Sequence, residues 1–170
     1  MTLKGGILGF IIGLLLLLLV VWTGLKLGYA PVATSAPPLP FETYLAKTAL
    51  DARVAKEAPQ SNPAALTEQT YMAGAKLYRE HCAVCHGLPG QAKTAIAAGM
   101  FPKPPQLFPG KGVTDDPAGE TYWKIRNGIR LTGMPGFQSA LSEDQMWQIA
   151  SLLANADKIP APVQEELNKQ

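Results

Sequence analysis

The sequence predicts an all-α protein with a single hydrophobic helix near its N-terminal end. Residues 5–25, GGILGFIIGLLLLLLVVWTGL, contain no charged side chain and are long enough to cross a hydrocarbon core of about 30 Å as one helix. Farther along, apolar residues recur at helical spacing behind capping residues at Thr67, Asp116 and Ser142. No segment shows the alternation of a strand that would compete with these helices.

The apolar segment is predicted to be a retained membrane anchor within a first region of residues 1–30. A cleaved secretory signal is the alternative, but the apolar part of such a signal is usually about 7–15 residues long. Prolines also follow the candidate cleavage sites at Ala30 and Ala36. Lys4 and Lys26 flank the segment nearly symmetrically, so charge alone does not orient it in a membrane.

Two further segments precede the C-terminal part of the chain. Residues 31–40, PVATSAPPLP, are proline-rich and are expected to form an extended, semi-rigid spacer of about 3 Å per residue. Residues 41–60 are predicted to contain an amphipathic helix over residues 41–58 and a connector. The apolar side of this helix either packs on the domain that follows or docks onto a membrane partner, and it comprises Phe41, Tyr44, Leu45 and Leu50.

The charges of the chain are almost balanced, with 15 Lys and Arg against 13 Asp and Glu. Lys4 and Lys26 account for the whole excess, so the remainder of the chain is formally neutral. We therefore expect no strong steering of partners by net charge, although a local patch could still orient one. Nucleic-acid binding has no support in this composition.

Both cysteines and both histidines lie in the stretch EHCAVCHG, residues 80–87. The spacing Cys82-x-x-Cys85-His86 is compatible with a redox dithiol, with half of a zinc site or with covalent haem attachment. Zinc needs about four ligands, and ligands this crowded in sequence cannot all converge on one tetrahedral centre. A redox dithiol normally begins a helix after a strand, whereas here a helical pattern precedes the motif.

Covalent attachment of one haem accounts for every residue of the motif. Two thiols about one helical turn apart can add to the two vinyl groups of a porphyrin, and an imidazole directly after the second thiol is then carried to the iron. Cys82 and Cys85 are therefore predicted to form thioether links, and His86 is the expected proximal ligand. His81 is interpreted as an ordinary surface or packing histidine.

A methionine is predicted as the second axial ligand, because a thioether favours ferrous iron and His81 is the only other histidine. Met72 and Met146 lie within helical apolar patterns and are interpreted as core residues. Met134, in LTGMPGF, is preferred to Met100, because its neighbouring glycines and proline allow close approach to a flat ring. Met100 would in that case pack against the haem edge.

Residues 67–156 resemble a class I cytochrome c domain of the bacterial monohaem type. The resemblance is carried by GAKLYREHCAVCHG, PKPPQL, IRNGIRLTGMPGF and LSEDQMWQIASLL, of which the first and third are specific in combination. It implies a class I cytochrome c fold around one covalent haem c, placed at residues 61–160. Residues 161–170 are expected to be a loose tail. The segment GLPGQA after the haem motif departs from the longer glycine-rich run common in the family.

The resemblance also implies contacts inside the domain. The carbonyl of Pro105 is expected to accept a hydrogen bond from the imidazole N–H of His86, and such a bond would orient the histidine. Leu107 is expected to pack against the haem ring. In the family the first and last helices cross near the haem. Gly74 and Trp147 are interpreted as that contact, because a glycine admits a bulky ring.

In function, the resemblance implies an electron carrier and not an enzyme: a membrane-tethered protein that transfers single electrons between respiratory or dehydrogenase complexes, or that serves as the haem subunit of one. Its expected place is the bacterial inner membrane, with a cytoplasmic N-terminus and a periplasmic haem domain, and its expected partners are redox proteins, chiefly membrane complexes. No nucleic acid and no small-molecule substrate is expected. A haem enzyme or gas sensor is the alternative, and it would require an open sixth position. A dithiol or zinc module is a third hypothesis.

Overall fold

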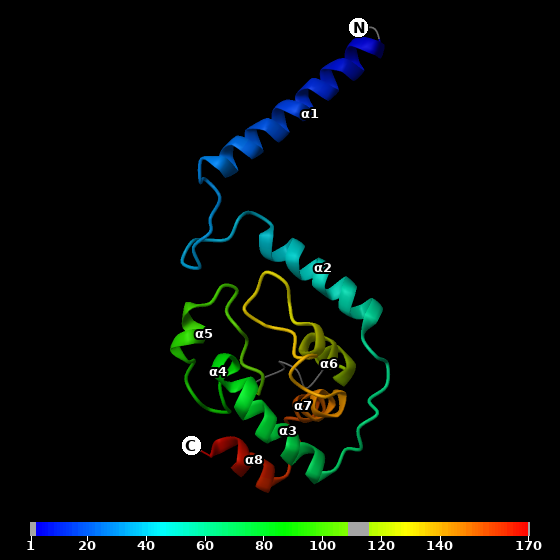
Figure 1. Ribbon diagram of the computed structural model, residues 1–170, viewed down its shortest axis with the longest axis vertical. Helices are drawn as coiled ribbons and strands as arrows, with labels where there is room; N and C mark the ends of the chain where they lie inside the picture. The colour runs from blue at the N-terminus through cyan, green and yellow to red at the C-terminus, as the bar shows by residue number, and fades with distance from the viewer. Residues whose placement is uncertain (1–2, 109–115, 170) are drawn as a thin grey trace. The chain divides into compact units, whose positions relative to one another are not determined.

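The computed structural model describes residues 3–108 and 116–169, and this part of the chain is helical without strands (Figure 1). The all-α class and the single apolar N-terminal helix are confirmed. The chain divides into two compact units, Met1–Glu42 and Thr43–Gln170.

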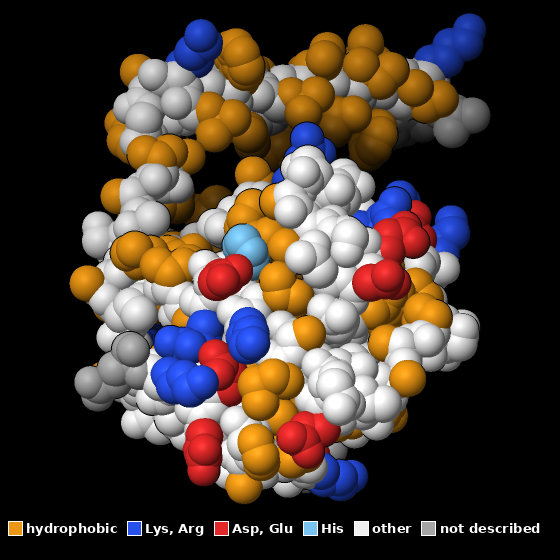
Figure 2. Space-filling view, turned by 60° about the horizontal axis from the view of Figure 1, so that its bottom comes forward, with side chains coloured by type: hydrophobic (Ala, Val, Ile, Leu, Met, Phe, Trp, Pro, Cys, Tyr) orange, Lys and Arg blue, Asp and Glu red, His pale blue; other side chains and the backbone are white. Residues whose placement is uncertain are grey.

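The first unit is dominated by α1 (Leu3–Lys26), which is uncharged throughout except for the lysines near its two ends. Figure 2 shows hydrophobic side chains along the length of this helix. At its C-terminal end, the Lys26 ammonium lies 5.2 Å from the centre of the Trp22 ring, a cation–π arrangement. By length and composition the helix can cross a membrane, a test that a signal sequence also passes.

The second unit is built around α3 (Glu68–His81), α6 (Ala118–Asn127) and α7 (Glu143–Ala154). The Thr67 hydroxyl accepts the amide of Thr70 at the start of α3, and Ser142 and Gln145 form the expected capping box on α7. Helix α7 contributes the largest share of the buried core, namely Met146, Trp147, Ile149, Ala150, Leu152 and Leu153.

Helices α3 and α7 cross at Gly74, as the family resemblance implies. A Cβ at Gly74 would collide with the carbonyl oxygen of Gln148 and lie 3.2 Å from the Cβ of Leu152. The expectation that Trp147 contacts Gly74 was wrong. The Trp147 ring instead stacks on Tyr122 of α6, with ring centroids 4.2 Å apart. Successive side chains point about 100° apart around a helix. Trp147 therefore faces α6, while the backbone of the next residue, Gln148, contacts α3.

Replacing Gly74 with alanine is expected to destabilise the domain by about 1–3 kcal/mol, the usual cost of overpacking a core. The atom in the way is a backbone oxygen, which can move only if α3 and α7 separate. Thermal or denaturant unfolding would measure the loss. Gly99→Ala is the matched control, because a Cβ there meets nothing within 4 Å and alanine favours the helix. Equal stability of the two variants would contradict the close crossing.

The N-terminus of α6 differs from the expectation by one residue. Asp116 does not cap the helix; Pro117 is the N-cap residue and makes no side-chain hydrogen bond there. Pro117 is extended, with φ −55° and ψ 134°, and this places the Asp116 carboxylate instead at 3.7 Å from Lys124 Nζ. The helix ends as predicted, at Gly128 with φ +68°.

Helix α2 (Glu42–Glu57) joins the second unit through its C-terminal half. Val54 and Ala58 are buried, and the Glu57 carboxylate accepts a hydrogen bond of 3.2 Å from Trp123 Nε1. This half therefore packs on its own domain, one of the two alternatives for the amphipathic helix. Tyr44 and Leu45 in its N-terminal half remain exposed, as does Phe41 directly before the helix.

A connecting strap, residues 58–64, holds α2 to the core. A Cβ at Gly119 of α6 would collide with the carbonyl oxygen of Pro59. The Asn62 side-chain amide donates to Ser151 Oγ of α7 at 2.8 Å. The packing of the second unit thus begins before residue 61.

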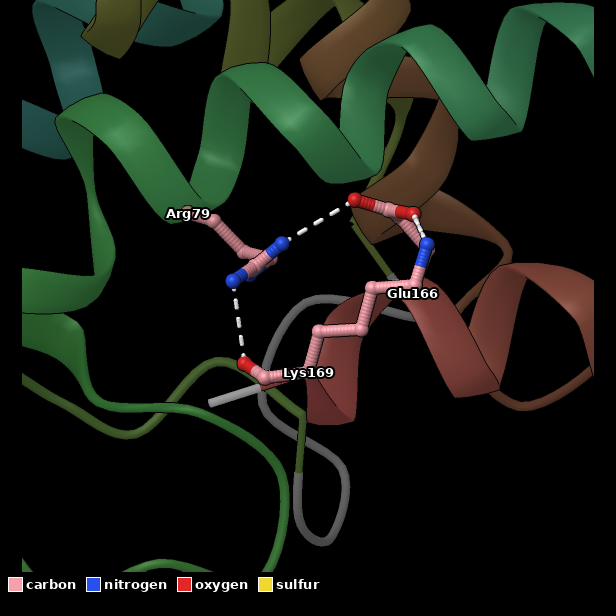
Figure 3. A network of polar contacts seen from close by, with 3 residues as sticks. All are labelled: Arg79, Glu166 and Lys169. Atoms are coloured by element: carbon pink, nitrogen blue, oxygen red, sulfur yellow. Dashed lines mark hydrogen bonds and ion pairs between the residues drawn. The ribbon is translucent and has the colours of Figure 1, made fainter.

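The expectation of a loose C-terminal tail was wrong. Residues Ala161–Asn168 form α8, which packs on α3 with Val163 and Leu167 fully buried. The Arg79 guanidinium donates at 3.0 Å both to the Glu166 carboxylate and to the Lys169 carbonyl (Figure 3). Two buried apolar residues and this network fix a segment that is otherwise polar.

Acidification is expected to weaken the attachment of α8. Hydrogen bonding to Lys169, followed by weaker effects of Arg79, lowers the pKa of Glu166 against an opposing effect of burial. A lowered pKa in the folded state gives stability that is present above the ordinary glutamate pKa of about 4.3 and is lost as pH falls through the folded value. Melting temperatures between pH 7 and pH 3 should therefore fall more steeply in the unaltered protein than in Glu166→Gln. Glu165→Gln, on an exposed residue, is the control, and parallel curves for all three proteins would contradict this role.

Candidate haem-binding site

Helix α3 continues into the cysteine motif, where α4 (Ala83–His86) forms one further turn. The amide of Cys82 donates to Tyr78 O, and the amide of His86 donates to Cys82 O, both at 2.8 Å. Cys82 and Cys85 are thereby one turn apart, and both are half-buried free thiols. Burial, followed by the effect of Cys85, raises the pKa of Cys82 to about 12. A reactive dithiol is favoured by a lowered thiol pKa, and the environment of Cys82 acts in the opposite direction.

The His86 ring is held from one side. Its Nδ1 lies 2.8 Å from the Pro105 carbonyl oxygen, the contact that the resemblance implies. This bond places the proton on Nδ1 and leaves Nε2 available as a ligand. Burial lowers the pKa of His86, while the bond to Pro105 acts in the opposite direction. The imidazole is therefore neutral near pH 7, the form that binds a metal.

The chain leaves the motif through a second fixed point that the sequence reasoning missed. The buried Tyr78 hydroxyl donates to the Gly87 carbonyl at 2.7 Å. Gly87 has φ +74°, and a Cβ there would lie 2.7 Å from the side-chain nitrogen of Gln106. In the sequence Tyr78 is one of the residues at helical spacing before the cysteine motif, and no local pattern indicates a hydrogen bond to Gly87, which lies beyond that helix.

The loop that contains Met134 is held by its own backbone. The Met134 carbonyl accepts the amide of Ile129 at 3.1 Å, and the Met134 amide donates to Thr132 Oγ at 3.1 Å. The amide of Phe137 then donates to Ile125 O of α6 at 2.9 Å. The hydrogen bond between Thr132 and Met134 was not predicted from the sequence. Threonine hydroxyls often accept a backbone amide two residues later in a turn, so the position of Thr132 could have indicated it.

Two glycines allow this loop to close against the end of α6. A Cβ at Gly128 would lie 2.5 Å from the amide nitrogen of Gly136, and one at Gly136 would lie 2.9 Å from the Arg126 carbonyl oxygen. Backbone therefore packs on backbone. The loop that carries Met134 is therefore fixed in position by its contacts with the end of α6.

Met100, the alternative ligand, comes to the same loop. It is half-buried, and a Cβ at Gly133 would collide with its terminal methyl group. Met100, expected at the haem edge, therefore lies next to the loop of Met134, the expected ligand. The choice of Met134 as ligand stays a prediction.

Half-buried apolar side chains complete the site. The His81 ring packs edge-on to Phe137, with centroids 6.0 Å apart, in the packing role expected of it. Phe108 meets Tyr78 edge-on at 4.9 Å. The apolar residues that pack partly buried against the core include Leu77, Leu88, Leu107, Phe108, Met134 and Phe137.

These residues fit a covalently attached haem. They comprise two thiols one turn apart, an imidazole with Nδ1 engaged, and a thioether on a backbone-fixed loop among apolar side chains. Such a donor set would suit c-type attachment with histidine–methionine ligation.

Comparison with known proteins supports this interpretation. The family model described as "Cytochrome C oxidase, cbb3-type, subunit III" matches residues 69–153. The comparison with curated proteins gave no match. Among solved structures, a chain of the "Kuenenia stuttgartiensis reducing HAO-like protein complex" is similar, with 29% identity and a TM-score of 0.49. That similarity covers 55% of this chain and 46% of the other, so less than half of the neighbour is represented. Because the family model spans half of the sequence and includes the cysteine motif and Met134, the chain belongs to this family of class I c-type cytochromes.

Proposed function

We propose that this cytochrome is a membrane-tethered carrier of single electrons with one haem c. In this proposal Cys82 and Cys85 hold the haem through thioethers, and His86 and Met134 ligate the iron. The family match indicates an electron-carrier domain. The observation that supports the finer assignment is the 2.8 Å contact between His86 Nδ1 and Pro105 O directly after the cysteine motif.

The fixed geometry of the site suits electron transfer. A haem bound here would supply a one-electron Fe(III)/Fe(II) couple. Pro105 orients His86 and increases its basicity, while the hydrogen bonds of Ile129 and Thr132 hold Met134. Ligands held in this way change position little between oxidation states, so each transfer requires little rearrangement of the protein.

The proposed location is the bacterial inner membrane, with α1 as the anchor and the haem domain in the periplasm. The partners are redox proteins, chiefly membrane complexes that donate or accept electrons. Since the description of the family model names an oxidase subunit, stable membership of a membrane oxidoreductase is one form that this function can take. An anchored carrier searches a thin layer beside the membrane, which raises its effective concentration at such partners.

Removing the anchor tests the proposal. A protein starting at Pro40, exported behind a cleavable signal, is expected to retain the visible spectrum and midpoint potential, because all the proposed ligands lie in the second unit. It should leave the membrane fraction and support slower electron flow between membrane complexes at equal expression. Spectroscopy, potentiometry and respiration measurements would check this. Release of the full-length protein from membranes at high pH, or undiminished electron flow after truncation, would contradict the tether.

A further inference from the structure

Exposed apolar side chains gather in the part of the chain that directly follows α1. Among the described residues beyond α1, more than half of the exposed large hydrophobic side chains lie between residues 27 and 45. The same stretch holds a single charged residue, Glu42, whose carboxylate accepts the amide of Leu39 at 2.7 Å. Contiguous exposed apolar surface of this kind marks a contact with another molecule. Three of its side chains are aromatic, namely Tyr29, Phe41 and Tyr44.

Helix α2 has apolar residues on two opposite sides. One side carries Val54, which is buried in the second unit. At about 100° per residue, Leu45, Ala49 and Ala52 lie within about 40° of the opposite direction, and all three are exposed. We call these three residues the outer face of α2. The packing of the second unit therefore uses only one of the two apolar sides.

The charged side chains of α2 are engaged with one another. Lys47 pairs with Asp51, and Arg53 pairs with Glu57, both at 2.7 Å. Acidic and basic residues are equal in number along the helix, so α2 has no net charge. Charge complementarity therefore contributes little to a contact of the outer face, and that contact has to be apolar.

Phe41, directly before α2, adds a strained backbone to this region. It adopts φ +64°, a left-handed conformation that costs conformational energy for a residue with a Cβ. The turn is closed by the amide of Glu42, which donates to the Leu39 carbonyl at 3.1 Å. The ring exposes 76% of its surface, so the fold gains little from its hydrophobicity. A phenylalanine at this position is suited to a contact outside the chain.

We propose that residues 27–45 and the outer face of α2 lie in the headgroup region of a lipid bilayer. This inference rests on the proposed function, because it requires α1 to be retained as a membrane anchor. Tyrosine is enriched where a protein crosses the surface of a membrane, and an apolar helix face binds there in proportion to the apolar area that it buries. The contact holds the haem domain close to the bilayer in one orientation.

A helix of a partner protein is the competing occupant. Such a helix would cover the outer face of α2 but would leave the exposed apolar side chains of residues 27–41 without a partner. A lipid surface accounts for both, because this segment joins α1 to α2 and spans at most about 50 Å even when extended. Its proline-rich part is shortened by a turn, in which the Ala36 amide donates to the Ala33 carbonyl at 3.0 Å.

Hydroxyl-radical footprinting tests the contact in the full-length holoprotein, with one copy in each phosphatidylcholine nanodisc. After correction for intrinsic reactivity, Tyr29, Phe41 and Tyr44 are expected to lose most of their oxidation relative to Leu131, which is 92% exposed. Oxidation in proportion to their exposure would overturn the contact. Protection in native membranes without protection in nanodiscs would assign the surface to a partner protein instead.

Quenching of a headgroup-labelled fluorescent lipid by the haem measures how near the domain is held. Tyr44→Ser with Leu45→Ser is expected to lose much of this quenching, because the domain can then leave the surface. Leu66→Ser changes a similarly exposed leucine outside the segment and should quench normally. Visible spectra and melting temperatures would establish that both variants fold. Full quenching in the double variant, or an equal loss in Leu66→Ser, would overturn the proposed contact.

Failure of the lipid contact is distinguishable from failure of the proposed function. Full-length protein that stays in membranes at high pH, but shows neither protection nor a change in quenching, retains the tether and loses only the contact of α2. Release of the full-length protein at high pH would overturn the anchor, and the contact with it.

Discussion

Met134→Ala is expected to have a lower midpoint potential than the unaltered cytochrome and to bind carbon monoxide in its ferrous state. Methionine sulfur stabilises ferrous iron and fills the sixth coordination position. Its removal should therefore lower the midpoint potential and leave that position open to carbon monoxide. The fall should be a substantial part of the roughly 0.8 V over which axial ligands set haem potentials. Potentiometric titration and the carbon monoxide difference spectrum would measure both effects.

Met100→Ala provides the matched control, because it removes the same side chain from the neighbouring position against Gly133. This variant should retain the potential and should not bind carbon monoxide. The reverse result would make Met100 the ligand. Binding of carbon monoxide by the unaltered protein would instead favour a haem enzyme or gas sensor with an open position.

Replacing both Cys82 and Cys85 with serine is expected to abolish covalent attachment of haem completely. Serine hydroxyls do not form the thioether links, so any haem that associates should be removed by acid–organic extraction of the denatured protein. In the unaltered cytochrome the haem should stay with the chain under the same extraction. The haem stain of a denaturing gel, together with the mass of the intact protein, would measure attachment.

Each single substitution, Cys82→Ser or Cys85→Ser, controls for loss of folding, because one remaining thioether should still retain haem on the denatured chain. Extractable haem in the unaltered protein would contradict the proposed attachment. Retention of haem by the double variant would show that other residues hold it.

The parts of the fold that sequence predicts well are those set by neighbours along the chain. Thr67 with Thr70, and Ser142 with Gln145, satisfy helix amides within three residues, so the composition of a short segment is enough. The attachment motif is equally local, since Cys82, Cys85 and His86 share one turn.

The parts that sequence reasoning missed depend on packing at a distance. Gly74 meets the backbone of Gln148, and only the rotation of α7 against α3 decides that Trp147 points elsewhere. Helix α8 is stable because Val163 and Leu167 become buried against α3, which its own short, polar sequence does not reveal.

The connecting strap would have a mechanical consequence if α1 anchors the protein as proposed. Any pull on the tether reaches the second unit through α2 and the strap, where Pro59 rests on Gly119 and Asn62 is bonded to Ser151. Gly119 lies in the first turn of α6, while the methionine loop leaves its other end at Gly128, about 14 Å away at 1.5 Å per residue. If α1 anchors the protein in a membrane, tension would therefore act first on α6 and α7, which hold α2 and the strap, and not directly on the methionine loop.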